Sequence, residues 1–456
     1  MAMKNMTLQN IAKACGGAYY GSDAEKDCIV ESIVTDSRQV EKGSLFVAIP
    51  GERDDGHCFI PAVYEKGALA VLSQRRLDKP QGPYILVDST LEAVKWIAAF
   101  YRRQLPVKVV GITGSVGKTS TKEIIAASLS EKYNVLKTQG NFNNELGVPL
   151  TVFRLREEHE IAVLEMGINH FGEMHRLSRI VAPDVCVITN IGQCHLEFLG
   201  DRAGVLRAKS EIFDYMAEDG KIILNGDDDL LAQIREVKGI RPIFFGIDDE
   251  RAVYADEIES CGLHGIRCTI HADGEAVSVQ VPIPGIHMVR DALAAAAVGR
   301  AFGLTLEEIK NGIEKLQPVT GRFRLIEREH LTIIDDCHNA NPASMKASLD
   351  VLKDAAGRRV AILGDMGELG TDKAAMHAEV GRYAAQGRTD LLVCVGDASA
   401  EMASAARETG DCAVIYVTDL EEALGRLPEI LCEGDTVLVK ASHFMHFERI
   451  VERLSV

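Results

Sequence analysis

The sequence alternates short, continuous apolar runs with stretches of amphipathic helical pattern, and this rhythm restricts the fold more than any other feature. In the middle of the chain the runs IAVLE, VCVITN and KIILN end at Glu165, Asn190 and Asn225. The last third repeats the rhythm with LTIIDD, RRVAILGD, DLLVCVG, AVIYV and DTVLVKAS. Runs that are apolar throughout, instead of at every second residue, are typical of parallel strands covered on both faces by helices. The sequence therefore predicts two α/β domains behind a smaller mixed α/β domain, whose strand-like runs cover residues 44–49, 68–72 and 84–87.

Two joints that contain proline divide the chain. Gln104-Leu105-Pro106 follows a helical pattern at residues 96–103, and Leu316-Gln317-Pro318 ends another, with Gly321 close behind. Proline disfavours helical geometry in the residue before it, so both joints are expected domain boundaries. A chain of 456 residues is also long enough for about three domains. We therefore expect domains at residues 1–106, 107–317 and 318–456.

Charge and cysteine content exclude several classes of partner and compartment. Asp and Glu outnumber Lys and Arg by 67 to 50, for a net charge of −17, so we expect no binding to nucleic acid or to a membrane surface. An anionic substrate would have to be met by a few placed Lys and Arg residues. The 11 cysteines form no CxxC pair, and no run approaches the ~18 apolar residues of a membrane span, which predicts a protein of the reducing cytoplasm. We expect a monomer, although no pattern reports the oligomeric state.

A glycine-rich loop joins an expected strand at 108–111 to an expected helix that starts near Ser120. Glycines at positions 111, 114 and 117 let the backbone curl, so that successive N–H groups face phosphate oxygens at a helix N-terminus. Lys118 would reach the β- and γ-phosphates, and the Thr119 hydroxyl would hold Mg²⁺. The general pattern GxxxxGK[ST] has glycine where this chain has Ile112, and a structural turn is the alternative, but strand, glycines and helix together predict an ATP site. Its expected residues are Gly114, Ser115, Val116, Gly117, Lys118, Thr119 and Ser120.

The loop GITGSVGKTSTKE resembles the GxTGxxGKT loop of the Mur ligases, which build the stem peptide of peptidoglycan on UDP-N-acetylmuramic acid. The resemblance covers the whole chain in the family's order, through TDSRQVEKGSLFVAIPGERDDGHCFI, TQGNFNNELGVPLT, LEMGINHFGEM, NIGQCHLEFLG, RAKSEIF and GRF. The segments DDCHNANP, LGDMGELG and AMHAEVGRYAA resemble the branch that adds D-alanyl-D-alanine to UDP-N-acetylmuramoyl-tripeptide. The resemblance implies an ATP-dependent amide-bond ligase with those two substrates. It also implies a central P-loop ATPase domain with a parallel sheet and a Rossmann-like C-terminal α/β domain.

Three further positions are metal candidates beside Thr119. Glu165 ends an apolar strand, where a buried carboxylate is costly unless it is paired or bound to metal, and the cap of a helix is the alternative. His195 by itself reads as a hydrogen-bonded structural residue, because Mg²⁺ prefers oxygen ligands. Lys209 by itself reads as a solvated lysine on a helix face. The resemblance implies two Mg²⁺ ions, held at Thr119 and Glu165 and at His195 and a carbamylated Lys209, with Mn²⁺ tolerated.

The resemblance also assigns nucleotide contacts in the second half of the chain. The helix GIHMVRDALAAAA corresponds to one that touches adenine, but it has Met288 and Asp291 where the family has asparagine. An ionised Asp291 can only accept hydrogen bonds, which predicts weaker or rearranged adenine recognition. Arg322 resembles the arginine that reaches ATP phosphate on domain closure, and Asp336 the carboxylate that holds the ribose. Further departures from the family are Cys337, His338, Ala441 and His443.

Substrate positions follow in the same way. Thr35, Asp36, Ser37 and Arg38 resemble residues that contact UDP, and a capped turn is the alternative because Asp and Ser are good helix caps. Residues that resemble those on the peptide side are Asn143, Asn144, Asn339 and Asn341.

The implied reaction brings a carboxylate against a triphosphate, and two unit charges 4 Å apart repel by ~4 kcal/mol at an effective dielectric near 20. Attack on the γ-phosphate would give an acyl phosphate, which the amine of D-alanyl-D-alanine then displaces. The residues expected to offset the repulsion or to hold the cations are Lys118, Glu165, His195, Lys209 and Arg322.

Three other functions remain open at the level of sequence. One is a different ligase on the same scaffold, such as the enzyme that adds the third stem residue or folylpolyglutamate synthase. The second is a P-loop kinase or nucleotide-driven switch, and the third is a protein that binds the UDP-peptide without turnover. The sequence does not report whether the third stem residue is lysine or diaminopimelate, or whether the acceptor ends in D-alanine or D-lactate.

Overall fold

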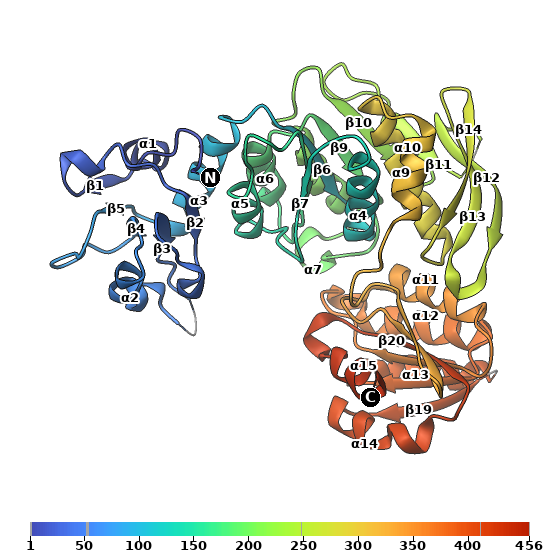
Figure 1. Cartoon of the computed structure of the whole chain (residues 1–456). Helices are drawn as coiled ribbons and strands as arrows, with labels where there is room; N and C mark the ends of the chain where they lie inside the picture. The colour runs from blue at the N-terminus through green and yellow to red at the C-terminus, as the bar shows by residue number, and fades with distance from the viewer. Residues whose placement is uncertain (1, 52–53, 248, 411, 456) are drawn as a thin grey trace.

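The computed structural model describes residues 2–51, 54–247, 249–410 and 412–455, and within them the chain forms three β-sheets (Figure 1). The N-terminal sheet lies at the left of Figure 1, the central sheet at the top, and the C-terminal sheet below the central one. Each sheet is flanked by helices, so the chain has the predicted α/β architecture in three parts. No helix among the described residues combines the length and the apolar character that a membrane span requires.

The N-terminal sheet has five strands in the order β1-β5-β4-β3-β2, and only the β1–β5 pair is antiparallel. The runs predicted at 44–49, 68–72 and 84–87 correspond to β3, β4 and β5, whose residues are almost entirely buried. The elements are α1 (Leu8–Cys15), β1 (Ala18–Tyr20), η1 (Asp23–Glu25), β2 (Ser32–Val34), η2 (Ser37–Gln39), β3 (Ser44–Val47), η3 (Gly56–Phe59), α2 (Ile60–Glu65), β4 (Ala70–Ser73), β5 (Tyr84–Leu86) and α3 (Thr90–Arg102).

The central sheet has nine strands in the order β14-β13-β12-β11-β10-β9-β6-β8-β7. Its elements up to β11 are β6 (Lys108–Thr113), α4 (Lys118–Leu129), β7 (Val135–Lys137), α5 (Gly147–Val152), β8 (Ile161–Glu165), α6 (Glu173–Val181), β9 (Val185–Ile188), α7 (Leu196–Leu199), α8 (Arg202–Ser210), η4 (Glu211–Phe213), β10 (Lys221–Asn225), η5 (Leu231–Gln233) and β11 (Ile243–Gly246). The parallel part contains the three apolar runs that end at Glu165, Asn190 and Asn225.

An antiparallel extension, which the sequence did not reveal, completes the central sheet. It consists of β12 (Val253–Ser260), η6 (Gly262–His264), β13 (Ile266–Ala272) and β14 (Glu275–Val281). Burial alternates along β13, so one face packs on a core and the other is open to solvent. The alanine-rich α9 (Ile286–Ala301) is buried against this extension and against α4, and α10 (Leu306–Glu314) follows it.

The C-terminal sheet has six strands in the order β15-β16-β20-β17-β18-β19, and only the β15–β16 pair is antiparallel. The five apolar runs predicted in this third are the five parallel strands. The elements are β15 (Arg324–Glu327), β16 (Leu331–Asp335), α11 (Pro342–Lys353), β17 (Arg359–Gly364), η7 (Gly370–Asp372), α12 (Lys373–Gln386), β18 (Leu391–Val395), α13 (Ser399–Thr409), β19 (Ala413–Val417), α14 (Leu420–Ile430), β20 (Asp435–Lys440), η8 (His443–Met445) and α15 (Glu448–Ser455).

The N-terminal part is joined to the central part by a continuous hydrophobic core. A single cluster of buried residues runs from Met3 to Leu231, because α3 packs against α5 and α6. The Tyr101 hydroxyl donates to the Leu155 carbonyl at 2.6 Å, and the Arg179 guanidinium lies 3.8 Å from the centre of the Trp96 ring. The C-terminal part instead has cores of its own on the two faces of its sheet. The first two parts are therefore held as one unit, and the third is attached less extensively.

Two glycines in the C-terminal helices differ in how much space surrounds them. A Cβ at Gly381 of α12 would lie 2.0 Å from the Met402 carbonyl oxygen of α13, whereas a Cβ at Gly425 of α14 meets nothing within 4 Å. We expect Gly381→Ala to lower the free energy of unfolding by about 1–3 kcal/mol through overpacking. Gly425→Ala should raise it by about 0.5–1 kcal/mol, because alanine favours the helix. Urea unfolding followed by circular dichroism measures both, and equal effects of the two substitutions would contradict this account of the packing.

Candidate active site

The glycine loop lies between β6 and α4, and α4 begins at Lys118, close to the predicted start near Ser120. Gly114 and Gly117 have φ values of 155° and 83°, and a Cβ at Gly114 would lie 1.9 Å from Thr189 Oγ1. Glycine is therefore required at Gly114 for both conformation and space. The Lys118 Nζ donates to the Gly114 carbonyl at 2.9 Å, so this side chain folds back over the loop that should hold phosphate.

Asn190 supports the loop from the end of β9 and was not among the predicted site residues. Its side-chain oxygen accepts from the Val116 N–H at 2.9 Å, and its carbonyl accepts from the Ser115 N–H at 3.1 Å. The signal that could have identified it was its position: it ends the apolar run VCVITN, beside the run that leads into the loop.

Thr119 and Glu165 are brought together as predicted for a cation site. The Thr119 hydroxyl donates to Glu165 Oε2 at 2.9 Å, and Asn143 Nδ2 donates to Glu165 Oε1 at 2.8 Å. Glu165 is 1% exposed, and the Lys122 ammonium, 3.9 Å from Oε2, offsets part of its charge. A hydroxyl and a carboxylate that share one buried corner of the cleft are the hard oxygen ligands that suit Mg²⁺. These residues therefore fit one Mg²⁺ beside the phosphate loop.

Lys209 is buried, so the interpretation of its pattern as a solvated lysine is wrong. It lies on the inner face of α8 with Gly204, Val205 and Ala208, and 1% of it is exposed. Burial lowers the pKa of Lys209 to about 8, since desolvation penalises the ammonium. Lys209 is outside the lining of the cleft as far as the described residues go, and the pattern missed its burial because it does not show what covers a helix.

His195 precedes α7 and contacts the C-terminal part of the chain. Its Nδ1 lies 2.5 Å from Glu368 Oε2 but is buried without a hydrogen-bond partner among the described residues. Lys209 offers no oxygen as an amine, so His195 and Lys209 fit a hard cation only if Lys209 is carbamylated. Among the described residues no cluster of three or more His, Cys, Asp or Glu side chains forms a ready-made metal site.

Helix α9 contributes His287 and Met288 to the cleft, whereas Asp291 lies behind the glycine loop and outside the cleft lining as far as the described residues go. The Thr121 hydroxyl donates to Asp291 Oδ1 at 2.6 Å, and Asp291 Oδ2 is buried without a hydrogen-bond partner among the described residues. Burial raises the pKa of Asp291 to about 7, against the opposing effect of hydrogen bonds from Ser120 and Thr121.

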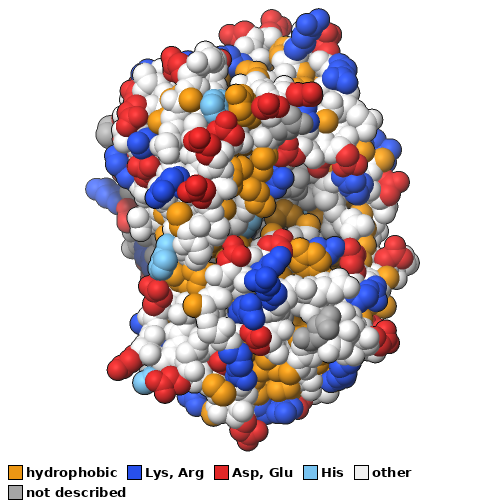
Figure 2. Space-filling model, turned by 90° about the vertical axis from the view of Figure 1, so that its right-hand side faces the viewer, with side chains coloured by type: hydrophobic (Ala, Val, Ile, Leu, Met, Phe, Trp, Pro, Cys, Tyr) orange, Lys and Arg blue, Asp and Glu red, His pale blue; other side chains and the backbone are white. Residues whose placement is uncertain are grey.

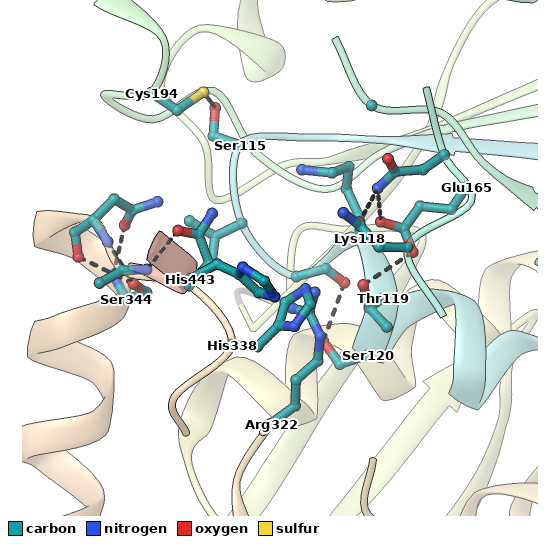
Figure 3. A pocket seen from close by; sticks show the side chains of 18 of the residues that line it. Ser115, Lys118, Thr119, Ser120, Glu165, Cys194, Arg322, His338, Ser344 and His443 are labelled. Carbon is teal, nitrogen blue, oxygen red and sulfur yellow. Dashed lines mark hydrogen bonds between the residues drawn. The ribbon is translucent and has the colours of Figure 1, made fainter. Parts of the chain in front are cut away.

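The C-terminal part supplies the opposite wall of the cleft. Arg322 and Asp336 both line it, and Lys440 Nζ forms a buried ion pair with Asp336 Oδ2 at 2.5 Å. Figure 3 shows Lys118, Thr119 and Glu165 on one side of the pocket and Ser344 and His443 across from them. The rings of His338 and His443 lie 5.7 Å apart, and burial lowers the pKa of His338 to about 4, so this imidazole is neutral near neutral pH.

The predicted substrate residues are distributed over two regions. Residues that line the cleft are Asn143, Asn144, Asn339 and Asn341. The Asn341 side chain also caps α11, and Asn144 Oδ1 accepts from the Gly147 N–H at the start of α5. Thr35, Asp36, Ser37 and Arg38 are outside its lining as far as the described residues go. There Asp36 caps η2 and pairs with Arg38 at 2.7 Å, and the Arg38 side chain is 87% exposed.

The cleft has a volume of about 920 Å³ and is walled by the central and C-terminal parts, with Leu91, Glu92 and Lys95 of α3 at its N-terminal end. Figure 2 shows the surface hollowed between the upper and lower halves of the molecule, with hydrophobic side chains inside the hollow. A phosphate loop at the carboxyl edge of a parallel sheet, a buried oxygen pair beside it, and a second α/β domain across the cleft define an ATP-dependent enzyme of the P-loop class. Comparison with protein families makes this assignment specific.

Three family models match consecutive parts of the chain. They are described as Mur ligase family, catalytic domain, at residues 29–108; Mur ligase middle domain, at 112–299; and Mur ligase, glutamate ligase domain, at 321–443. The UDP-N-acetylmuramoyl-tripeptide–D-alanyl-D-alanine ligase of Bacillus subtilis is 37% identical, with 99% of each chain aligned. The enzyme of the same name from Escherichia coli is also 37% identical, with 99% of each chain aligned. The chain belongs to the Mur ligase family.

Solved structures agree with this family in fold. MurF from Acinetobacter baumannii superposes with a TM-score of 0.90 at 36% identity, with 100% of each chain covered. The MurF ligase of Thermotoga maritima in complex with ADP superposes with a TM-score of 0.82 at 29% identity, covering 93% of this chain and 97% of that one. The predicted three-domain α/β fold is thereby confirmed.

The buried Asp291 predicts a pH dependence of stability. Its folded pKa, about 7, lies above the usual value of 3.8, so the stability that goes with its proton is complete below about pH 4 and is lost as pH rises through 7. Asp291→Asn should remove this loss of stability, which amounts to about 1.4 kcal/mol for each unit by which the folded pKa exceeds the usual pKa of an aspartate. Unfolding by urea at pH 5 and pH 8 measures it: the gain in stability of the variant over the wild type should be about 2–3 kcal/mol larger at pH 8 than at pH 5. Glu433→Gln, at an exposed carboxylate, is the control, and an equal gain at both pH values would contradict the assignment.

Proposed function

We propose that this protein is the ATP-dependent ligase that joins D-alanyl-D-alanine to UDP-N-acetylmuramoyl-tripeptide, with release of ADP and phosphate, in the synthesis of peptidoglycan precursors. The observation that carries the proposal is the 37% identity over 99% of the chain with ligases of that name. The cleft supports it, because the phosphate loop, the strip at Asn143 and Asn144, and the C-terminal loop at Asn339 line one cavity. A carboxylate, a nucleotide and an amine could meet there.

The first chemical step needs positively charged side chains that are not already in ion pairs within the protein. The terminal carboxylate of the tripeptide attacks the γ-phosphorus of ATP, the bond to ADP breaks, and an acyl phosphate forms. Lys118 donates only to a backbone carbonyl, and Arg322 forms no ion pair among the described residues. Both are free to turn to the phosphates, where they would offset the repulsion between the two anionic substrates. Lys440 is already paired with Asp336 and is less available.

Thr119 and Glu165 would hold one Mg²⁺, and His195 with a carbamylated Lys209 would hold a second. When bound, these ions supply electrostatic stabilisation to the phosphoryl oxygens and the carboxylate. Asn143 keeps Glu165 in place by donating to Oε1, and Thr119 fixes Oε2. The pair is thus oriented before a cation arrives.

Asp336 is oriented in a similar way for the ribose. The Ser348 hydroxyl and the Lys440 ammonium both contact Oδ2, at 2.7 and 2.5 Å. Within the described residues Oδ1 has no hydrogen-bond donor, so it can accept from a ribose hydroxyl. Asn339 and Asn341 would face the peptide or the amine, and Thr35, Asp36, Ser37 and Arg38 would bind UDP on the N-terminal domain. The amine attacks the acyl carbonyl, phosphate leaves with the electron pair of its bond, and the proton of the amine passes to solvent.

We also propose the domain limits 1–106, 107–317 and 318–456, a cytoplasmic location and a monomeric state. The sheets support these limits, since their strands lie within residues 18–86, 108–281 and 324–440.

Phosphate release in the presence of defined substrates tests the proposed function. We expect release only when UDP-N-acetylmuramoyl-tripeptide and D-alanyl-D-alanine are both present with ATP and Mg²⁺, and mass spectrometry should find the pentapeptide product. Lysine- and diaminopimelate-containing tripeptides, and D-alanyl-D-lactate, are compared in the same assay. Phosphate release without the dipeptide would indicate a kinase or a nucleotide switch, and binding without release would indicate a protein that has lost turnover.

Carbamylation of Lys209 gives a separate prediction. A neutral amine attacks CO₂ to form a carbamate and release one proton, and a pKa of about 8 makes the neutral amine far more abundant at pH 7–8 than in ordinary lysine. Activity should therefore fall in CO₂-depleted buffer and return when bicarbonate is added. Lys209→Ala should lose about 100-fold or more and recover partly with acetate, which should leave the wild type unchanged. Full activity without CO₂, together with no carbamate signal from ¹³C-bicarbonate in NMR, would contradict the modification.

A further inference from the structure

We propose that Thr189 and Asn190, at the end of β9, are positioning residues that fix the orientation of one peptide unit in the phosphate loop. The unit joins Val116 to Gly117. Its orientation decides whether the loop presents an N–H group or a carbonyl oxygen to the phosphates of the nucleotide. The inference rests on the proposed function only for ATP as the ligand of the loop.

Two side chains hold the Val116 carbonyl on the side of the loop that faces β9. Thr189 Oγ1 donates to this oxygen at 2.6 Å and Asn190 Nδ2 at 2.9 Å, so both of its lone pairs are occupied. Asn190 Oδ1 also accepts from the Val116 N–H at 2.9 Å. Val116 lines the cleft, whereas within the described ranges neither Thr189 nor Asn190 lines it. The carbonyl is therefore turned away from the space that the phosphates would occupy.

The orientation of this carbonyl determines that of the next N–H group. The peptide is trans, like every peptide bond in the described residues, and the C=O and N–H of a planar trans peptide point in opposite directions. The Gly117 N–H therefore points toward the cleft, and it has no hydrogen-bond partner in the described part of the chain. An N–H group at the start of α4 is a donor for a phosphate oxygen, whereas a carbonyl oxygen there would repel the phosphate.

Glycine makes the opposite orientation accessible, so the loop by itself does not fix this peptide. Gly117 has φ of 83°, and turning the peptide over would bring φ to a negative value that glycine adopts about as readily. The turned peptide would lose both donors to the Val116 oxygen and would place that oxygen against phosphate. The choice between the two orientations must come from contacts outside the loop, and Thr189 and Asn190 supply them.

The segment that carries Thr189 and Asn190 is fixed on its other side by the end of β10. Asn225 Nδ2 donates to the Thr189 carbonyl at 2.9 Å, and the Ile191 N–H donates to Asp228 Oδ2 at 2.8 Å. The two positioning residues are thus held from β10, which keeps their side chains in place when the loop is empty.

The same segment also holds Ser115, the loop residue before Val116. The Ser115 N–H donates to the Asn190 carbonyl at 3.1 Å, and the Gly192 N–H donates to Ser115 Oγ at 2.8 Å. Cys194 Sγ contacts the same hydroxyl at 3.1 Å, a contact that Figure 3 shows. Residues 189–194 therefore support one side of the loop and leave its other side to the nucleotide.

Displacement of a fluorescent ATP analogue from the full chain tests the proposal without peptide substrate or turnover. We expect Asn190→Ala and Thr189→Ala each to weaken binding of ADP and of inorganic tripolyphosphate by about tenfold or more, the usual effect of losing a hydrogen bond to a charged group. Binding of adenosine, which has no phosphate, should stay unchanged, and Thr189→Ser should restore most of the loss. Asn134→Ala is the matched control, because Asn134 Nδ2 also donates to a carbonyl at 2.9 Å, that of Glu158, away from the cleft lining.

Nuclear magnetic resonance observes the peptide unit directly. Labelling valine carbonyls with ¹³C and glycine with ¹⁵N selects the amide signals of glycines that follow valine, which are Gly111, Gly117, Gly299, Gly381 and Gly396. When ADP and Mg²⁺ are added to the wild type, the Gly117 signal should shift far more than that of Gly381 in α12, because its N–H gains a phosphate acceptor. In Asn190→Ala and Thr189→Ala this difference should be lost at saturating ADP.

Three results would overturn the proposal. They are unchanged affinity for tripolyphosphate in the folded variants, an equal loss of affinity for adenosine, and a Gly117 signal that shifts as in the wild type. In the ligase assay the variants should raise KM for ATP at least fivefold and leave KM for the UDP-tripeptide unchanged. Wild-type protein that binds ADP but forms no pentapeptide would count against the proposed function alone.

Discussion

The hydrogen bond between Thr119 and Glu165 is the interaction on which the arrangement of the site depends. Parallel pairing of β6 with β8 places Ile112 opposite Glu165, so the glycine loop and the carboxylate leave the sheet at the same edge. Glu165 is almost fully buried, and a carboxylate in that position must be compensated by donors or by a cation. Thr119 and Lys122 of α4 and Asn143 of the loop before α5 supply the compensation, so two segments must fold correctly to reach this carboxylate.

The three domains are joined unequally, and the difference suits a reaction with an unstable intermediate. The N-terminal and central domains share one core, through α3 and the stacking of Arg179 on Trp96, so the part proposed to bind the UDP-peptide is held rigidly to the phosphate loop. The C-terminal domain has its own cores and meets the central domain through a few polar pairs and apolar contacts that include Leu196 and Leu263. A domain attached in this way can approach and withdraw, and its approach would keep water from the acyl phosphate.

Sequence reasoning predicted what depends on local pattern and missed what depends on distant contacts. Continuous apolar runs identified the parallel strands. The positions of Thr119 and Glu165 followed from patterns at strand and helix ends, and that of Arg322 from the family resemblance. The β12–β14 extension was missed because its strands are half exposed and lack a continuous apolar run. The burial of Lys209 was missed because a helical pattern does not show what covers the helix. The close approach of Glu368 to His195 was missed because the two residues are 173 positions apart in the chain and lie in different domains.

The chain is acidic overall, yet the proposed substrates are anions. Binding them requires positively charged side chains in the cleft that are not already paired with carboxylates of the protein. Lys95 is held by Glu92 and Glu145, and Lys440 by Asp336, so both are neutralised within the protein. Lys118 contacts only a carbonyl, and Arg322 is without an ion pair in the described part of the chain. Arg322 is half-buried, and partial desolvation lowers the pKa of its guanidinium. Bound phosphate would offset this desolvation, so we expect nucleotide to favour closure of the domain that carries Arg322.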